Sequence, residues 1–338
     1  MKAILLNDFG DVSNFQPADL PTPVAGPGQV LVKVAAASVN PVDIKNRSGG
    51  RAIAPELPGV LGCDMAGVVE AVGEGVSGLR PGDRVYGCVG GVKGMPGTYA
   101  EYVAADARLL APAPGDLSLR EAAALPLVFI TAWEGLVDRA QVKRGDTVLV
   151  HGGAGGVGHV AIQIAKEKGA RVVATVSSAE KGDLAKSFGA DEVVNYREET
   201  VEQYVARLTE GRGFDIVFDA TGGKDIATSF AAARLNGQVV TIVSMYEADL
   251  SPMHLKGLSL HVVFMLIPML HDTPAPLDRS HHGWILRRAA EMANAGHLKP
   301  HLDPTRFTLD QVAEAHTHLE SGKAVGKVVV DVAGDLVG

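Results

Sequence analysis

The stretch that decides the fold is Thr147-Val-Leu-Val-His-Gly-Gly-Ala-Gly-Gly-Val-Gly158. Its first five residues predict a short buried strand, and residues 158–169 carry apolar side chains at helical spacing. The glycines between them follow the pattern G-x-G-x-x-G, which between a strand and a helix is typical of dinucleotide binding at the helix start. A glycine-rich turn without a ligand is the alternative. The residues predicted to contact the dinucleotide here are Gly153, Gly155, Gly156, Val157 and Gly158.

Strand and helix patterns alternate beyond this turn, which predicts βαβ units and a doubly wound parallel sheet. The predicted strands are 171–176, 192–195, 214–219 and 238–243, with a further candidate at 258–266. The predicted helices are 179–188, 201–209 and 226–235.

The two ends of the chain have a different character. The β-branched runs 29–36, 66–72 and 84–87 are bounded by Gly and Pro, and a last strand is predicted at 327–332 after a helix at 309–321. We therefore expect an α/β protein in which a Rossmann domain, residues 121–298, is inserted into a β-rich domain. Residues 1–120 and 299–338 would form that second domain.

The composition excludes several classes of protein. A net charge of −8 without a basic stripe argues against nucleic-acid binding. Two cysteines in 338 residues argue against a disulfide framework. The apolar stretch 258–270 is interrupted by His261 and Pro268 and is shorter than the roughly 20 residues of a membrane-spanning helix. Since the N-terminus also lacks a signal-peptide pattern, we expect a cytoplasmic protein without a membrane partner.

The strand after the glycine turn decides between NADH and NADPH. NAD enzymes usually place an Asp or Glu at its end, about 20 residues after the glycines, to bind the ribose 2′-hydroxyl. Here Ser177 and Ser178 follow the strand and can donate to a 2′-phosphate, and Lys181 can pair with its charge. A simple helix cap at Ser178 is the alternative, and the neighbouring Glu180 opposes a phosphate. We predict NADPH.

Further stretches resemble the zinc-independent, zeta-crystallin-like quinone oxidoreductases of the medium-chain dehydrogenase/reductase superfamily. The resemblance covers essentially the whole chain. It implies a GroES-like catalytic domain around the inserted Rossmann domain, an active site between the two, and a homodimer formed through the strand at 258–266. The matching stretches are 37–49, 62–73, 81–85, 125–133, 151–158 and 325–329.

The resemblance also implies roles for single residues. Asn40, Asp43 and Arg47 fall in the segment that lines the substrate pocket, where Asn40 either bonds a substrate oxygen or only forms the turn before a proline. Lys45 replaces a tyrosine common in relatives and either polarises the substrate carbonyl or points to solvent. The residues implied at the cofactor are Thr131 at the carboxamide, Tyr196 near the adenosine phosphate, Ser244, Phe264 and Met265 near the nicotinamide, and Lys327 in a segment closing over the cofactor.

The zinc-binding alcohol dehydrogenases of the same superfamily hold a catalytic zinc with a Cys, a His-Glu pair and a second Cys. The corresponding positions here are Asn40, Cys63-Asp64 and, approximately, Leu127, and only Cys88 lies in the region of the structural-zinc cysteines. Zinc needs three or four N, S or O ligands, so we predict no metal and interpret Cys63 as a small buried residue.

Without a metal, hydride must pass from the nicotinamide to an acceptor that needs little electrophilic help. The predicted function is therefore NADPH-dependent reduction of a quinone. Reduction of α,β-unsaturated carbonyls is the main alternative, because no motif separates the two. A non-enzymatic NADPH-binding protein and a zinc alcohol dehydrogenase are weaker alternatives.

Overall fold

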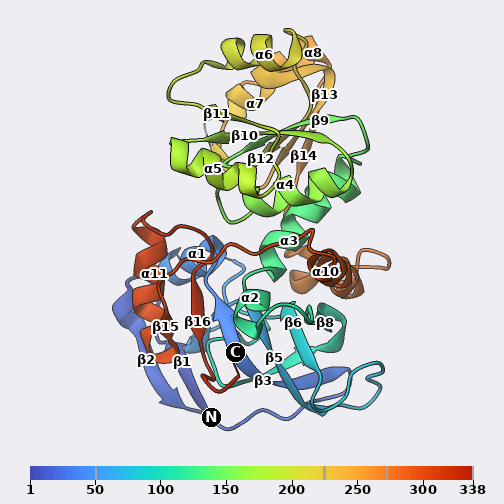
Figure 1. The fold of residues 1–338 in the computed structure, drawn as a ribbon. Helices are drawn as coiled ribbons and strands as arrows, with labels where there is room; N and C mark the ends of the chain where they lie inside the picture. Colours follow the sequence, from blue (N-terminus) through green and yellow to red (C-terminus); the bar gives the residue numbers. More distant parts are fainter. Residues whose placement is uncertain (50–51, 224–225, 272, 337–338) are drawn as a thin grey trace. The chain divides into compact units, whose positions relative to one another are not determined.

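The computed structural model describes residues 1–49, 52–223, 226–271 and 273–336, which divide into two compact units (Figure 1). Unit 1 contains Met1–Leu127, Leu266–Gly296 and Pro300–Gly338, and unit 2 contains Val128–Met265 and His297–Lys299. The first and last parts of the chain therefore build one unit, and the middle part builds the other. This confirms the predicted insertion of an α/β domain into a β-rich one.

Unit 2 is a doubly wound α/β structure. Its six parallel strands lie in the order β11-β10-β9-β12-β13-β14, which is the strand order of the Rossmann fold. The strands are β9 (Thr147–His151), β10 (Arg171–Val176), β11 (Glu192–Asn195), β12 (Phe214–Asp219), β13 (Ala233–Thr241) and β14 (Ser259–Val262). The helices are α4 (Gly158–Glu167), α5 (Ala179–Ser187), α6 (Val201–Thr209), α7 (Ile226–Ala232) and α8 (Ser251–Lys256), with a π-helical segment, η3 (Glu134–Arg139), before β9.

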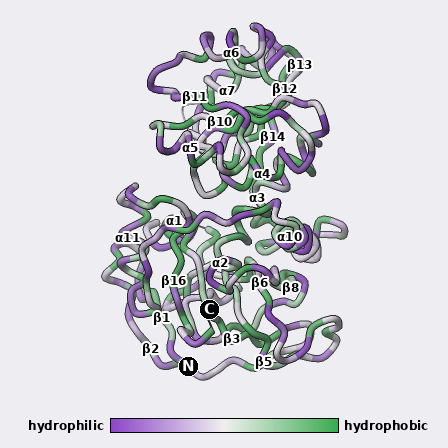
Figure 2. The backbone as a smooth tube through the Cα atoms, in the orientation of Figure 1, coloured by the Kyte–Doolittle hydropathy of each residue, from purple (hydrophilic) through white to green (hydrophobic). Residues whose placement is uncertain are grey.

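The central strands of unit 2 are apolar along nearly their whole length, because parallel strands are covered on both faces. Leu149, Val173, Phe214 and Val239 are fully buried in this core, and Figure 2 colours the sheet mainly hydrophobic. Such uninterrupted apolar runs, bounded by turn residues, are easy to recognise. The predicted bounds of β9, β10, β11 and β12 are therefore confirmed to the residue.

Several predicted segments of unit 2 are wrong at their ends, including the strand predicted at 238–243, which is observed at Ala233–Thr241. The helix predicted at 226–235 ends at Ala232, and β13 begins at the next residue, where Ala233 pairs with Phe214. The register then shifts, and Asn236 adopts a φ of 54°, so an irregularity inside the strand replaces the expected loop. The strand predicted at 258–266 shortens to β14, because the chain turns into α9 (Ile267–Leu270) soon afterwards.

Unit 1 is β-rich. Its larger sheet has the order β15-β16-β3-β5-β6-β8, with β7 paired to β3, and its smaller sheet has the order β2-β1-β4. The C-terminal strand β16 pairs antiparallel with β3, so the chain ends in the unit where it began. The strands are β1 (Lys2–Leu6), β2 (Phe15–Asp19), β3 (Gln29–Ser38), β4 (Gly59–Val60), β5 (Asp64–Val72), β6 (Arg84–Cys88), β7 (Tyr102–Asp106), β8 (Leu110–Pro112), β15 (Phe307–Thr308) and β16 (Val329–Asp331). The helices are α1 (Pro41–Gly49), α2 (Leu119–Ala123), α3 (Pro126–Trp133, which continues into unit 2), α9, α10 (Arg279–Asn294) and α11 (Val312–Glu320), with 3-10 turns η1 (Val12–Asn14), η2 (Ala107–Leu109) and η5 (Leu309–Gln311).

The point at which the chain returns to unit 1 differs from the predicted residue 299. Residues 266–296 already belong to unit 1, because α10 packs on β6 and β8, and the Tyr86 hydroxyl donates to the Leu286 carbonyl at 2.6 Å. No helix was predicted at 279–294, and no local pattern in the sequence shows which sheet such a helix covers. Among the described residues no helix, α10 included, is long and apolar enough to cross a membrane.

Candidate functional site

The glycine turn lies at the carboxyl end of β9, between β10 and β12, where the winding of the sheet reverses. Crevices at this point bind nucleotides in open α/β sheets. A Cβ on Gly153 would lie 2.6 Å from the Cβ of Ala174, and a Cβ on Gly158 would lie 2.1 Å from the Gly152 carbonyl oxygen. The helix α4 therefore begins directly against the turn, an arrangement that presents unpaired N–H groups to a pyrophosphate.

Thr175 on β10 holds the glycine turn in place, a role that sequence reasoning missed. Its Oγ1 lies 3.1 Å from Nδ1 of His151 and accepts from the Gly152 N–H at 3.3 Å. Its carbonyl oxygen accepts from the Gly153 N–H at 3.1 Å. These bonds organise the turn without a ligand. The one feature of the sequence that could have revealed this role is a threonine near the end of an otherwise apolar strand.

The residues predicted at the 2′-phosphate follow two neighbouring strands. Val176 and Asn195 are register partners at the carboxyl ends of β10 and β11, and the Tyr196 N–H donates to the Val176 carbonyl at 3.2 Å. Ser177 and Tyr196 therefore leave the sheet side by side, and the Tyr196 side chain is 55% exposed. Ser178 caps α5 by accepting from the Lys181 N–H at 3.4 Å.

Glu180 is the acidic residue of this group. A hydrogen bond from Ser178 lowers the pKa of Glu180, so a bound phosphate would compete with this carboxylate for the same hydroxyl. The end of β10 itself carries Ser177 and Ser178 rather than an Asp or Glu. With the exposed Lys181 in the first turn of α5, these residues fit a dinucleotide that bears a 2′-phosphate.

A second group that sequence reasoning missed lies at the carboxyl ends of β12 and β13. Asp219 accepts through Oδ1 from the Thr221 N–H at 3.1 Å, the Thr221 hydroxyl at 2.8 Å and the Gly222 N–H at 2.8 Å. Its Oδ2 accepts from the Thr241 hydroxyl at 3.2 Å. The buried carboxylate thus shapes the loop that follows β12, at the edge of the sheet where a dinucleotide would lie.

The remaining cofactor residues predicted in unit 2 lie on separate elements. Ser244 is exposed in the loop after β13, and Phe264 and Met265 follow β14, so all three lie beyond the carboxyl edge of the sheet. Phe264 is 42% exposed and Met265 is buried. Thr131 lies on α3 and is 6% exposed.

A buried polar cluster in unit 1 is formed by Ser38, Asn40, Asp64 and Lys327, and we name it the Asp64 cluster. Asp64 Oδ2 accepts from Ser38 Oγ at 3.0 Å and from Asn40 Nδ2 at 2.9 Å, and Oδ1 accepts from the Leu127 N–H at 3.0 Å. Lys327 Nζ donates to Asn40 Oδ1 and lies 3.9 Å from Asp64 Oδ2. Burial raises the pKa of Asp64 and lowers the pKa of Lys327, and their mutual attraction opposes both shifts.

Two residues of this cluster were predicted to act at the substrate or cofactor. Asn40, predicted either to bond a substrate oxygen or to form the turn before a proline, is fully buried, and both polar atoms of its side chain are engaged within the protein. Lys327, predicted in a segment that closes over the cofactor, turns its amine into the interior of unit 1. Its backbone fixes that direction, because its N–H donates to the His301 carbonyl at 2.8 Å and its carbonyl accepts from the Asp303 N–H at 2.9 Å.

The other substrate-pocket residues predicted on α1 are also largely buried. Burial raises the pKa of Asp43 to about 7, while hydrogen bonds from the Asn40 N–H, at 2.8 Å, and from Cys63 lower it. Arg47 is 3% exposed, donates to the Gly10 carbonyl and pairs with Glu320 on α11 at 2.6 Å. Arg47 therefore connects α1 to the Gly10 loop and to α11. Lys45 is half-buried.

A catalytic zinc ion does not fit the residues at the positions discussed above. Asn40 and Asp64 direct their oxygens at protein donors, and the position near Leu127 offers no ligand atom in its side chain. The hydrogen bond with Cys88, together with burial, raises the pKa of the Cys63 thiol, which opposes the thiolate that zinc requires. Within residues 1–49, 52–223, 226–271 and 273–336, no group of three His, Cys, Asp or Glu is placed to hold a metal.

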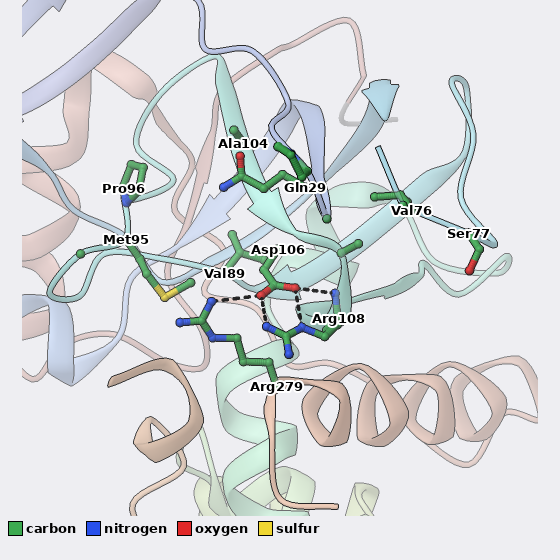
Figure 3. A pocket seen from close by; sticks show the side chains of 15 residues that line it. Gln29, Val76, Ser77, Val89, Met95, Pro96, Ala104, Asp106, Arg108 and Arg279 are labelled. Carbon is green, nitrogen blue, oxygen red and sulfur yellow. Dashed lines mark hydrogen bonds and ion pairs between the residues drawn. The ribbon is translucent and has the colours of Figure 1, made fainter. Parts of the chain in front are cut away.

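A surface pocket of about 590 Å³ lies elsewhere in unit 1 (Figure 3). Asp106 lies there between two guanidinium groups, 2.8 Å from Arg108 and 3.0 Å from Arg279, and Val89 and Met95 contribute apolar walls. The residues that line it include none of those predicted at the substrate or cofactor. Arg108 also lies 3.4 Å from Asp278, so the two guanidinium groups are paired with two carboxylates of unit 1.

Two family models match the chain. The model described as alcohol dehydrogenase GroES-like domain matches residues 26–115, and the model described as zinc-binding dehydrogenase matches residues 188–330. Among curated relatives, the 2-methylene-furan-3-one reductase of Solanum lycopersicum is 37% identical over 98% of this chain and 79% of its own length. The quinone oxidoreductase of Homo sapiens is 30% identical over 98% of this chain and 97% of its own.

Solved structures match over the same range. An NAD-dependent alcohol dehydrogenase has a TM-score of 0.86 and 36% identity, with 98% of this chain and 100% of that chain covered. The mycobacterial protein Rv1454c, complexed with NADPH, has a TM-score of 0.83 and 33% identity, with 98% and 99% covered. These matches confirm the predicted fold class and family. The chain belongs to the zeta-crystallin-like quinone oxidoreductases of the medium-chain dehydrogenase/reductase superfamily, and it is an oxidoreductase that uses a nicotinamide dinucleotide and a small-molecule substrate.

Proposed function

We propose that this enzyme transfers a hydride from NADPH to a quinone or another α,β-unsaturated carbonyl, without a zinc ion. The observation that carries the choice of NADPH is the carboxyl end of β10, where Ser177, Ser178 and the nearby Lys181 stand in place of an acid. One of the two solved relatives is named for NAD and the other is complexed with NADPH, so the choice of dinucleotide is argued from the residues of this chain.

Each part of the dinucleotide has candidate partners in unit 2. The N–H groups of Gly156, Val157 and Gly158, at the end of the turn and the start of α4, would bind the pyrophosphate, and Ser177, Lys181 and Tyr196 would bind the 2′-phosphate. Thr131 and Ser244 would orient the nicotinamide, against the apolar side chains that follow β14. When bound, NADPH supplies the hydride. The protein contributes position and the exclusion of water.

The class of hydride acceptor is inferred from the Asp64 cluster, which offers no ligands for a metal that would activate a carbonyl. With Asn40 and Asp64 directed at protein donors, neither supplies a ligand for a Lewis-acid metal. A saturated ketone would need such help for its alkoxide, whereas a quinone or enone spreads the arriving charge through conjugation. The name of the tomato relative specifies a conjugated ketone and that of the human relative a quinone, so both acceptor classes are proposed.

The decisive experiment is a screen of NADPH consumption with 1,2-naphthoquinone, an open-chain enone and a saturated ketone, each repeated with NADH. We expect turnover with NADPH and at least one conjugated acceptor, and little with the ketone. Rapid NADPH oxidation by the quinone alone would favour the quinone reductase, and rapid oxidation by the enone alone would favour the alkene reductase. Turnover limited to the saturated ketone, or equal use of NADH, would contradict the proposal.

We also propose a homodimer formed through the edge of the unit 2 sheet. In the part of the chain that the structure describes, β14 pairs only with β13, and Val262 and Phe264 are each 42% exposed at or just beyond its end. An apolar edge strand with open N–H and C=O groups is a template for pairing with a second copy.

A further inference from the structure

Lys327 is held in an unusual place for a lysine. Its side chain is 4% exposed, and a buried ammonium is costly unless it is paired and hydrogen-bonded. Here Nζ donates to Asn40 Oδ1, lies 3.4 Å from the Val39 carbonyl oxygen as a second acceptor, and forms an ion pair with Asp64 at 3.9 Å. The chain supplies every partner that the cation needs.

Asp64 shows the complementary arrangement. Three donors point at its two oxygens, two from the end of β3 and the turn after it and one from the start of α3, and an ionised carboxylate, which only accepts, suits all three. The Asn40 amide connects the two charges, because its oxygen accepts from the ammonium and its Nδ2 donates to the carboxylate. The Asp64 cluster is thus a closed network with one positive and one negative charge.

This network involves three of the positions at which zinc-binding relatives would place ligands, namely Asn40, Asp64 and the region of Leu127. A divalent ion at these oxygens would lie beside the Lys327 ammonium in a buried environment, where like charges repel strongly. It would also have to displace the hydrogen bonds of Asn40 and Asp64. The charge that a metal would supply is already present as an ammonium group.

We propose that the Lys327 ammonium is the resident cation of this site and replaces a metal ion by neutralising Asp64 and orienting Asn40. Lys327 is therefore a positioning residue, because Asn40 begins the turn into α1 and its N–H also bonds Asp43. The inference rests on the proposed zinc-free function. It explains how the Asp64 carboxylate of unit 1 is neutralised without a zinc ion.

The test compares four variants of the full chain: Lys327→Met, Asp64→Asn, the double variant, and Lys323→Met as a control on an exposed lysine. Each of the first two leaves one buried charge unpaired, so we expect each to lower the thermal midpoint by roughly 10 °C. The double variant should recover at least half of that loss, because it leaves no unpaired charge. Lys323→Met should leave the midpoint unchanged.

Zinc binding provides an independent measurement. The wild-type chain, dialysed against zinc and then metal-free buffer, should retain no stoichiometric zinc by elemental analysis. One zinc per wild-type chain that is lost in Asp64→Asn would overturn the proposal. It would also be overturned if the decreases in thermal midpoint of the two single variants simply added in the double variant. If Lys327→Met does not fold, the zinc content of the wild type still tests the proposal. The double variant then provides the second test, because the proposal predicts that it folds. Neither readout uses NADPH or an acceptor, so a failed acceptor screen and a failed charge-pair test are separate results.

Discussion

Asp43 couples the stability of unit 1 to pH. Burial raises its pKa to about 7, above the ordinary value of 3.8, so the folded chain keeps a proton there that the unfolded chain has released. The stabilisation is complete below pH 3.8 and is lost as pH rises to about 7. Wild type should therefore lose stability from pH 5 to pH 8, whereas Asp43→Asn cannot lose a proton at this position. Over that range the free energy of unfolding of Asp43→Asn should rise by roughly 2–4 kcal/mol relative to that of wild type.

Urea unfolding at the two pH values measures this difference. Asp116→Asn, on an exposed loop of the same unit, is the matched control and should show the same difference from wild type at both values. A constant difference for Asp43→Asn as well would mean that this carboxyl does not titrate on unfolding in that range.

Lys181 should decide the preference between the two dinucleotides. It is exposed in the first turn of α5, and its charge can pair with a 2′-phosphate that NADH lacks. Lys181→Ala should raise the KM for NADPH about tenfold, the effect of one charged hydrogen bond near solvent, and leave the KM for NADH unchanged. Lys186→Ala, in the last turn of the same helix, should change neither value. Equal effects on both cofactors would contradict the phosphate assignment.

A candidate site whose residues lie close together in the chain can be predicted from the sequence, whereas residues that hold distant segments in place cannot. Ser177, Ser178 and Lys181 lie together in the chain, next to a recognisable turn. Asn40 and Lys327 are 287 positions apart, and no pattern within one sequence shows that they share a hydrogen bond. Thr175 and Asp219 were missed for a similar reason, because their partners belong to neighbouring strands or loops.

At the scale of elements, the contact between the glycine turn and α4 leaves the least space for a side chain at Gly158. A Cβ on Gly158 would lie 2.1 Å from the Gly152 carbonyl oxygen, so Gly158→Ala must push the helix away from the turn. We expect at least a tenfold loss of NADPH affinity, because the helix start can no longer approach the pyrophosphate. Fluorescence titration with NADPH measures this loss.

Gly115→Ala, in a loop of unit 1 outside the predicted dinucleotide site, is the control for that substitution. Its Cβ would meet only the side-chain oxygen of Asn294, at 3.9 Å, so affinity for NADPH should not change. Equal losses in the two variants would show that the contact at Gly158 has no special role.

The accuracy of the predicted elements follows their surroundings. The buried parallel strands β9 to β12 were predicted to the residue because both faces are apolar and turns bound them clearly. The junction of α7 and β13 was wrong because helix and strand follow each other without a loop, so no turn residues mark the change. Helix α10 (Arg279–Asn294) was not predicted, and its residues were assigned to the other unit, since packing partners leave no local pattern.

At the scale of the whole molecule, the proposed dimer can be tested at the edge of the unit 2 sheet. Val262→Lys places a charge on β14, where a second copy would have to bury it, so the variant should be a monomer by light scattering. Val24→Lys, which changes an 85% exposed valine in unit 1, should leave the mass of the wild type unchanged. A monomeric wild type, or a dimeric Val262→Lys, would contradict the assignment of this edge.

The pairing of β16 with β3 has a consequence for synthesis on the ribosome. Unit 2 is almost contiguous and can assemble as soon as residue 299 has left the exit tunnel. Unit 1 has to wait, because Ala36–Ser38 of β3 lacks one partner strand and Asp64 lacks Lys327 until residues 327–331 emerge. The nascent chain therefore carries an open sheet edge and a carboxylate without its cation until β16 is available, which makes the docking of β16 a late step in the folding of unit 1.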